Sequence, residues 1–188
     1  MADYLHVLAL ALMPAFGNFA GGVVAELIPT SRRMLNRALH AAAGIVTAVV
    51  AVELMPEALG GSAPPWAIVV GLCLGGAFYV LVEWFVDLMQ GGDEDAAGAW
   101  MIYVAVAIDL FSDGLMIGVG SVVSFGLAFI LALGQIMADV PEGFATIANF
   151  KEKGASRRRR IVLSASFVVP GLLGASIGFW LLRGQGER

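Results

Sequence analysis

Four acidic residues lie within two apolar stretches of this sequence, at spacings that would let them hold a metal cation. Asp109 and Asp113 are four residues apart, and Asp139 and Glu142 are three apart, so each pair falls on one face of a helix. A carboxylate in the middle of a bilayer costs roughly 2.5–3.5 kcal/mol on insertion scales. A bound divalent cation, or protonation of some of the carboxylates, removes most of that cost. The sequence therefore predicts a cation site formed by these four residues.

The second acidic pair belongs to a longer polar stripe. At helical spacing the stripe comprises Gln135, Asp139, Glu142, Thr146 and Asn149. Pro141 removes a backbone donor within the stripe and frees a carbonyl one turn back, which membrane helices tolerate where the freed group lines a cavity. The stripe favours a cation pathway in which Gln135 and Asn149 are additional members. The alternative is a polar seam that only holds helices together.

Further acids could extend this pathway. Glu53 lies deep in the second apolar segment and could join the site, whereas Glu57 lies near the outer surface. Glu83 and Asp87 lie toward the cytoplasmic end of the third apolar segment. At that position an exit site and a solvated helix end explain the two acids equally well.

The composition of the chain indicates that transmembrane helices position these acids. The chain has 188 residues, of which 59% are hydrophobic and 14% charged, and its mean hydropathy is +0.85. Such a balance is typical of a polytopic membrane protein, and each apolar segment reaches the roughly 20 residues that a spanning helix needs. We expect an all-α, six-helix transmembrane bundle that forms a single domain over residues 1–188. The expected spans are 4–28, 38–59, 65–90, 98–121, 125–149 and 160–183.

The basic residues predict the orientation in the bilayer. Nine of the 11 lie in two connections, after the first and the fifth span, and these are Arg32, Arg33, Arg37, Lys151, Lys153, Arg157, Arg158, Arg159 and Arg160. By the positive-inside rule both connections face the cytoplasm, so both termini lie outside the cytoplasmic (inner) membrane. A run of arginines beside a span is a topology anchor rather than a nucleic-acid patch. We therefore expect the lipid bilayer, and no nucleic acid, as a partner.

Several of these stretches resemble motifs of the Zrt/Irt-like (ZIP) family of divalent metal transporters. The family's fifth span contains His-Asn/Asp-x-Pro-Glu-Gly, matched by Ala-Asp-Val-Pro-Glu-Gly at 138–143. Its fourth span contains His-Asn-x-x-Glu-Gly, matched by Asp-Leu-Phe-Ser-Asp-Gly at 109–114. The end of its second span, His-Leu-Leu-Pro-Glu-Ala, is matched by Glu-Leu-Met-Pro-Glu-Ala at 53–58. Residues 166–175 look like the family's sixth span, and the motifs occur in the family's order.

The resemblance implies a function as a transporter whose substrate is a divalent cation of the Zn, Mn and Fe class, with no organic cofactor, and it implies a homodimer. Carried over residue by residue, one metal site comprises Asp109, Asp113 and Glu142, and a second would add Asp139 to the shared Asp113 and Glu142. The sequence departs from the family at Asp109 and Ala138, which replace histidines, and it has six spans where the family usually has eight. We therefore expect a one-metal centre. Carboxylate ligands suit Mn²⁺ or Mg²⁺. Because the resemblance points to transition metals, we expect Mn²⁺ or Fe²⁺, with Zn²⁺ as a remaining option.

Two other functions are alternatives to transport. Paired aspartates also serve in intramembrane proteolysis, but the Gly-x-Gly-Asp context is missing and no Ser–His or Cys–His pair is evident. We therefore expect that the protein is not an enzyme. The second alternative is a degenerate, non-transporting ZIP-like membrane protein with a metal-binding or regulatory role, which the replaced histidines favour.

Overall fold

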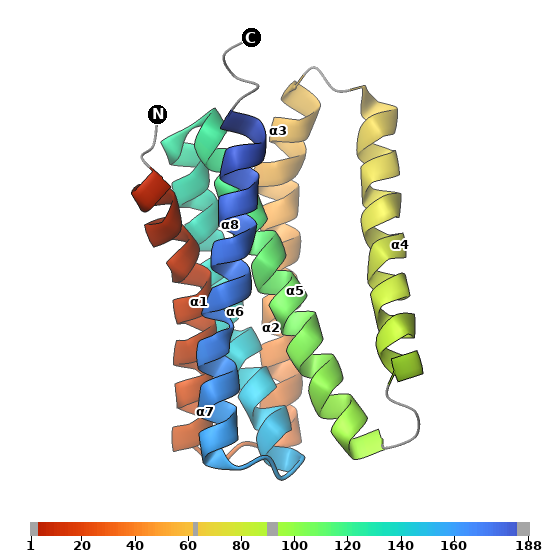
Figure 1. Ribbon diagram of the computed structural model, residues 1–188, viewed down its shortest axis with the longest axis vertical. Coiled ribbons are helices and arrows are strands. Elements are labelled where there is room, and N and C mark those ends of the chain that lie inside the picture. The colour runs from red at the N-terminus through yellow and green to blue at the C-terminus, as the bar shows by residue number, and fades with distance from the viewer. Residues whose placement is uncertain (1–3, 62–63, 90–93, 184–188) are drawn as a thin grey trace.

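The computed structural model of the protein describes residues 4–61, 64–89 and 94–183, and these residues form helices only (Figure 1). The helices run Tyr4–Leu27 (α1), Arg32–Val49 (α2), Val50–Leu54 (η1, a π-helical turn), Met55–Gly60 (α3), Pro65–Met89 (α4), Glu94–Val123 (α5), Phe125–Glu152 (α6), Arg157–Ser166 (α7) and Val168–Arg183 (α8). Six helical segments are long and apolar enough to cross a membrane. This confirms the predicted all-α architecture with six candidate spans, which identifies an integral membrane protein.

Three helices begin earlier than the apolar segments suggested, and one of them is α5, which starts at Glu94 rather than at residue 98. Helix α2 starts at Arg32 rather than at residue 38, because the Ser31 side chain accepts a hydrogen bond from the backbone N–H of Met34 at 3.3 Å. Likewise α7 starts at Arg157, after Ser156 caps the N–H of Arg159 at 3.4 Å. Hydropathy marks the part of a helix that lies in the membrane, whereas the cap determines where the helix begins.

Prolines interrupt two of the spans. The last span, expected as one helix, is divided at Phe167 into α7 and α8, because Pro170 has no N–H to donate to the carbonyl of Ser166. The second span passes from α2 through the π-helical turn η1 into α3, and Pro56 is the second residue after this wider turn. A proline at that position cannot donate to the carbonyl of Val52, and a π-helical turn is one way in which a helix accommodates the lost bond.

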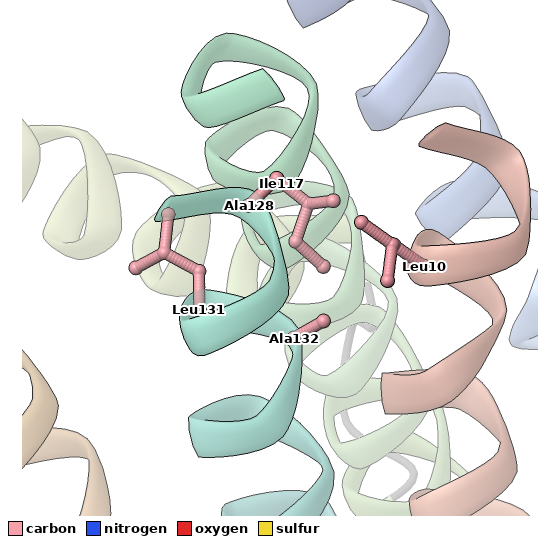
Figure 2. Packing of buried hydrophobic residues seen from close by; sticks show 5 residues of the cluster. All are labelled: Leu10, Ile117, Ala128, Leu131 and Ala132. Carbon is pink, nitrogen blue, oxygen red and sulfur yellow. The ribbon is translucent and has the colours of Figure 1, made fainter. Parts of the chain in front are cut away.

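The bundle has a closely packed part and a loosely attached part. In the packed part α1 lies along α6 and α5 lies along α8, while α5 and α6 also touch each other. Figure 2 shows the cluster where three helices meet, with Leu10 from α1, Ile117 from α5, and Ala128, Leu131 and Ala132 from α6. By contrast α4 stands to one side (Figure 1), and none of its apolar stretch Pro65–Val82 is buried within the described chain.

Glycines bring the helices of the packed part into backbone contact. A Cβ atom on Gly21 of α1 would lie 2.8 Å from the backbone nitrogen of Phe144 on α6. Similarly, a Cβ on Gly174 of α8 would lie 2.8 Å from the backbone nitrogen of Leu115 on α5, and one on Gly178 would lie 3.0 Å from that of Val119. Gly174 and Gly178, four residues apart on α8, therefore form a small-residue packing contact of the kind that this spacing favours.

The glycine contacts predict a position-specific loss of stability. We expect Gly174→Val to lower the free energy of unfolding by about 1–3 kcal/mol, because the new side chain would meet the α5 backbone, which cannot move aside. The matched control is Gly75→Val on α4, where a Cβ would meet nothing within 4 Å. Thermal unfolding of both purified variants in the same detergent measures the difference. Equal midpoints would show that the α5–α8 contact does not limit stability.

Candidate metal centre

Helix α5 supplies two aspartates from successive turns of one face. Asp113 is buried, with 4% of its surface exposed, while Asp109 is half-buried. Gly114, the next residue, packs against α8, where a Cβ would lie 2.9 Å from the backbone nitrogen of Ala175. This contact holds α5 against α8, so the direction in which the two aspartates project is fixed by helix packing.

Helix α6 supplies the second acidic pair, on either side of a proline. Asp139 is 1% exposed and Glu142 is half-buried, with Pro141 between them. The next residue, Gly143, rests against α1, where a Cβ would lie 2.7 Å from the Cα atom of Asn18. Because only glycine allows this approach, the contact fixes the depth and rotation of the acidic turn of α6.

Three of the acids converge in the interior of the bundle. Asp109, Asp113 and Asp139 each offer a carboxylate oxygen, and these oxygens all lie within 4.8 Å of one another. Glu142 lies within side-chain hydrogen-bonding reach of Asp109 and of Asp139. The Oδ2 atoms of Asp113 and Asp139 are buried and have no hydrogen-bond partner among the described residues. The four predicted ligands are therefore neighbours, and two of their oxygens need a partner.

The spacing of the carboxylates fits a single cation. Oxygens that bind one ion at about 2.0–2.6 Å are separated by at most roughly 5 Å, so carboxylates within 4.8 Å of one another could surround one ion with little movement. Without a cation or a proton, two unit charges at this distance repel by about 3 kcal/mol at an effective dielectric constant of ~20. A divalent cation between the carboxylates would attract each of them and so offset this repulsion. The geometry is thus compatible with the one-metal centre that the sequence suggested.

The other predicted site residues lie along the bundle at different places. Gln135 is buried on α6, about one turn before Asp139. Asn149 is half-buried and donates its amide to the carbonyl of Ala145 at 3.1 Å, so part of its hydrogen-bonding capacity is used within its own helix. Glu53 falls in the π-helical turn η1, and Glu83 and Asp87 fall in α4, but these three side chains lie outside the described residues. Their part in the pathway stays a prediction.

One further polar residue of the interior, Asn18 on α1, lies beside the acidic turn of α6. Asn18 is 1% exposed, and neither its amide nitrogen nor its amide oxygen has a hydrogen-bond partner among the described residues. Its backbone touches α6 at Gly143, one residue beyond Glu142. A lone asparagine in an apolar span whose neighbours are glycines is the signal that could have marked it, because a buried amide requires a polar partner.

Comparison of the chain with protein-family models, with curated proteins and with solved structures gave no match. The resemblance to the ZIP family therefore rests on the motif residues alone. The function has to be argued from the arrangement of the acids.

The unpaired carboxylates predict opposite effects of one substitution with and without metal. In the presence of a chelator, Asp113→Asn should raise the free energy of unfolding by up to about 3 kcal/mol, because it removes like-charge repulsion at the site. With Mn²⁺ or Zn²⁺ added, the unsubstituted protein should gain stability by mass action and the variant should gain much less. Thermal unfolding in both conditions gives the measurement.

The control for this experiment is Glu152→Gln, which changes a half-exposed acid at the end of α6; its carboxylate is paired with Arg32 at 2.9 Å. An exposed pair of this kind contributes little, so the control should behave as the unsubstituted protein does. If Asp113→Asn destabilised the chelated protein, the carboxylate would be a structural hydrogen-bonding group and not a metal ligand.

Proposed function

We propose that this protein is a ZIP-like transporter that moves divalent metal cations across the membrane through the acidic site between α5 and α6. The observation that supports this proposal most is the convergence of Asp109, Asp113 and Asp139, whose carboxylate oxygens lie within 4.8 Å of one another with two buried oxygens unpartnered. Helix contacts that serve only for packing use hydroxyl or amide groups, which cost far less to bury than carboxylates. A cluster of acids at this position is therefore better explained by a cation substrate.

The polar stripe of α6 supports transport rather than static binding. From Gln135 to Asn149 the stripe covers 15 residues, and the rise from the first to the last is about 21 Å of helix. The hydrocarbon core of a bilayer is about 30 Å thick, so polar side chains follow most of the membrane along this one helix. A static metal site would require polar groups at one depth only.

The proposal includes the orientation and the surroundings of the bundle. The α1–α2 and α6–α7 connections lie at the same end (Figure 1), where Arg32 pairs with Glu152 at 2.9 Å. We place this basic end in the cytoplasm and both termini outside the inner membrane. A homodimer in which α4 is covered by lipid or by a second copy agrees with this placement.

A non-transporting relative that only binds metal is the second candidate. The residues that favour it are Asp109 and Ala138, which stand where the family has histidines. Such a protein would bind metal at the same carboxylates without moving it. Uptake measurements separate the two functions.

One prediction from this proposal concerns metal uptake. In proteoliposomes, Asp113→Asn and Glu142→Gln should each reduce entry of Mn²⁺, Fe²⁺ or Zn²⁺ by at least about tenfold, because a lost ligand charge costs more than ~1.4 kcal/mol of binding. Each change keeps the shape of the side chain, and Glu152→Gln serves as the control. Uptake at the unsubstituted rate in either variant would contradict the site. Metal binding without uptake by the unsubstituted protein would identify the non-transporting relative.

A further prediction from this proposal concerns metal preference. Asp109→His, alone or with Ala138→His, should raise the ratio of Zn²⁺ to Mn²⁺ uptake severalfold, because imidazole nitrogen suits Zn²⁺ better than carboxylate oxygen does. Asp109→Asn is the control that separates the lost charge from the added nitrogen. Competition between the two metals in the same liposomes measures the ratio. An unchanged ratio would mean that residue 109 does not touch the ion.

A further inference from the structure

A groove between α1 and α7 lies apart from the candidate metal centre, near the basic end of the bundle. It encloses about 110 Å³, and none of the four acids of the metal centre lines it. A single water molecule needs only about 10–15 Å³, so the groove has room for part of a larger molecule. Its apolar wall includes Phe19, Val23 and Ile161, which are between one third and one half exposed and so open toward the outside of the bundle.

Positive charge gathers at one end of this groove. Arg160 is 9% exposed and its guanidinium donates to both carboxylate oxygens of Glu26, with the second bond 2.9 Å long. Arg157 lines the same groove but lies 4.0 Å from Glu26, at the limit of an ion pair, and its side chain is 73% exposed. Glu26 is thus satisfied by Arg160, and Arg157 keeps donors for an anion.

The backbone adds to this positive end. Arg157 is the first residue of α7, a helix of 10 residues whose N–H groups point toward the same end. Ser156 occupies only the N–H of Arg159. An anion held by Arg157 would therefore also lie near the start of a helix.

A buried hydroxyl deeper in the groove is without a partner. Ser164 lines the groove, is 4% exposed, and its Oγ has no hydrogen-bond partner among the described residues. Other helical hydroxyls in the described chain return their hydrogen to a carbonyl three or four residues earlier, as Ser112, Thr146, Ser166 and Ser176 do. Ser164 makes no such hydrogen bond among the described residues. It lies seven residues, or about 10 Å of helix, from Arg157. Its hydroxyl is available to a ligand that reaches inward from the basic end.

We propose that this groove binds an anionic phospholipid of the surrounding membrane. The phosphate lies at Arg157 and the start of α7, an ester carbonyl accepts from the hydroxyl of Ser164, and an acyl chain lies against Phe19, Val23 and Ile161. A ligand with one charged end, a polar middle and an apolar tail matches this order of groups, whereas a free phosphate would leave the apolar wall and the hydroxyl unused. Basic pockets between membrane helices on the cytoplasmic side are a recurring form of site for anionic headgroups.

The test uses the full chain in neutral detergent, with phosphatidylglycerol and phosphatidylcholine of the same acyl chains offered in equal amounts. Native mass spectrometry of the protein counts the lipids retained. We expect phosphatidylglycerol to be retained over phosphatidylcholine, and Arg157→Gln to reduce that preference about fivefold, the factor that corresponds to the attraction of one basic residue. Arg158→Gln is the control, since it removes the same charge from the same run at a residue that does not line the groove.

A second pair of variants tests the apolar wall. Val23→Trp fills the groove and should reduce retention of phosphatidylglycerol, whereas Val24→Trp, at an exposed neighbour outside the groove, should leave it unchanged. Equal effects of Arg157→Gln and Arg158→Gln, or of the two tryptophan variants, would overturn the proposal, as would the lack of any preference for the anionic lipid. Displacement of the lipid by millimolar inorganic phosphate would also overturn it and identify a free-anion site. Unfolding temperatures of the variants verify that each is folded.

Discussion

Like-charge repulsion inside an apolar bundle is the constraint on which the rest of this structure depends. Asp109, Asp113 and Asp139 place carboxylate oxygens within 4.8 Å of one another, where water is largely excluded and two oxygens lack a partner. Such an arrangement is stable only with a bound cation or with protons on some of the acids. Stability and cation binding are then linked, because any ion that prefers the folded site also stabilises the fold. The scaffold must therefore resist the tendency of these acids to move apart.

The packing of the helices provides that resistance through backbone contacts. Apolar side chains gain little by leaving lipid for the bundle interior, so helix association in a membrane depends on close van der Waals contact. Gly21 and Gly143 bring α1 against α6, and Gly114 and Gly174 bring α5 against α8. Each helix of the acidic pair is thus backed by another helix at the closest distance that the backbone permits. Among the described residues the peripheral α4 makes no such contact, because a Cβ on Gly71, Gly75 or Gly76 would meet nothing within 4 Å.

The basic end of the bundle has structural as well as topological roles. Lys151 donates to the carbonyls of Ala25 at 3.3 Å and Ile28 at 3.5 Å, which satisfies groups left free near the end of α1. Arg160 joins α7 to Glu26 on α1 through a largely buried, two-pronged ion pair. The exposed pair between Arg32 and Glu152 contributes much less, because water screens it. Residues that the positive-inside rule treats alike therefore differ in what they stabilise.

The sequence by itself determined the class of the protein, the six apolar segments and the four acids of the candidate site. These follow from local properties: hydropathy over about 20 residues, and the three- and four-residue spacing that puts Asp109 with Asp113 and Asp139 with Glu142 on common helix faces. The Gly174-x-x-x-Gly178 contact was predictable for the same reason. Helix starts at Arg32 and Arg157 were missed, because a serine cap and not hydropathy sets them.

Only the tertiary structure decided which faces meet. Neither the meeting of the α5 and α6 acids, nor the pairing of Glu26 with Arg160, nor the unpartnered state of Asn18 and Ser164 can be read from spacing, because each depends on residues far apart in the chain. The physical reason is that a helix determines the direction of its own side chains, whereas its rotation and depth are set by contacts with its neighbours. In this bundle glycines against backbone set the contacts of α1 with α6 and of α5 with α8, and the cluster around Leu10, Ile117 and Leu131 joins α5 to α6, so that the two acidic faces meet.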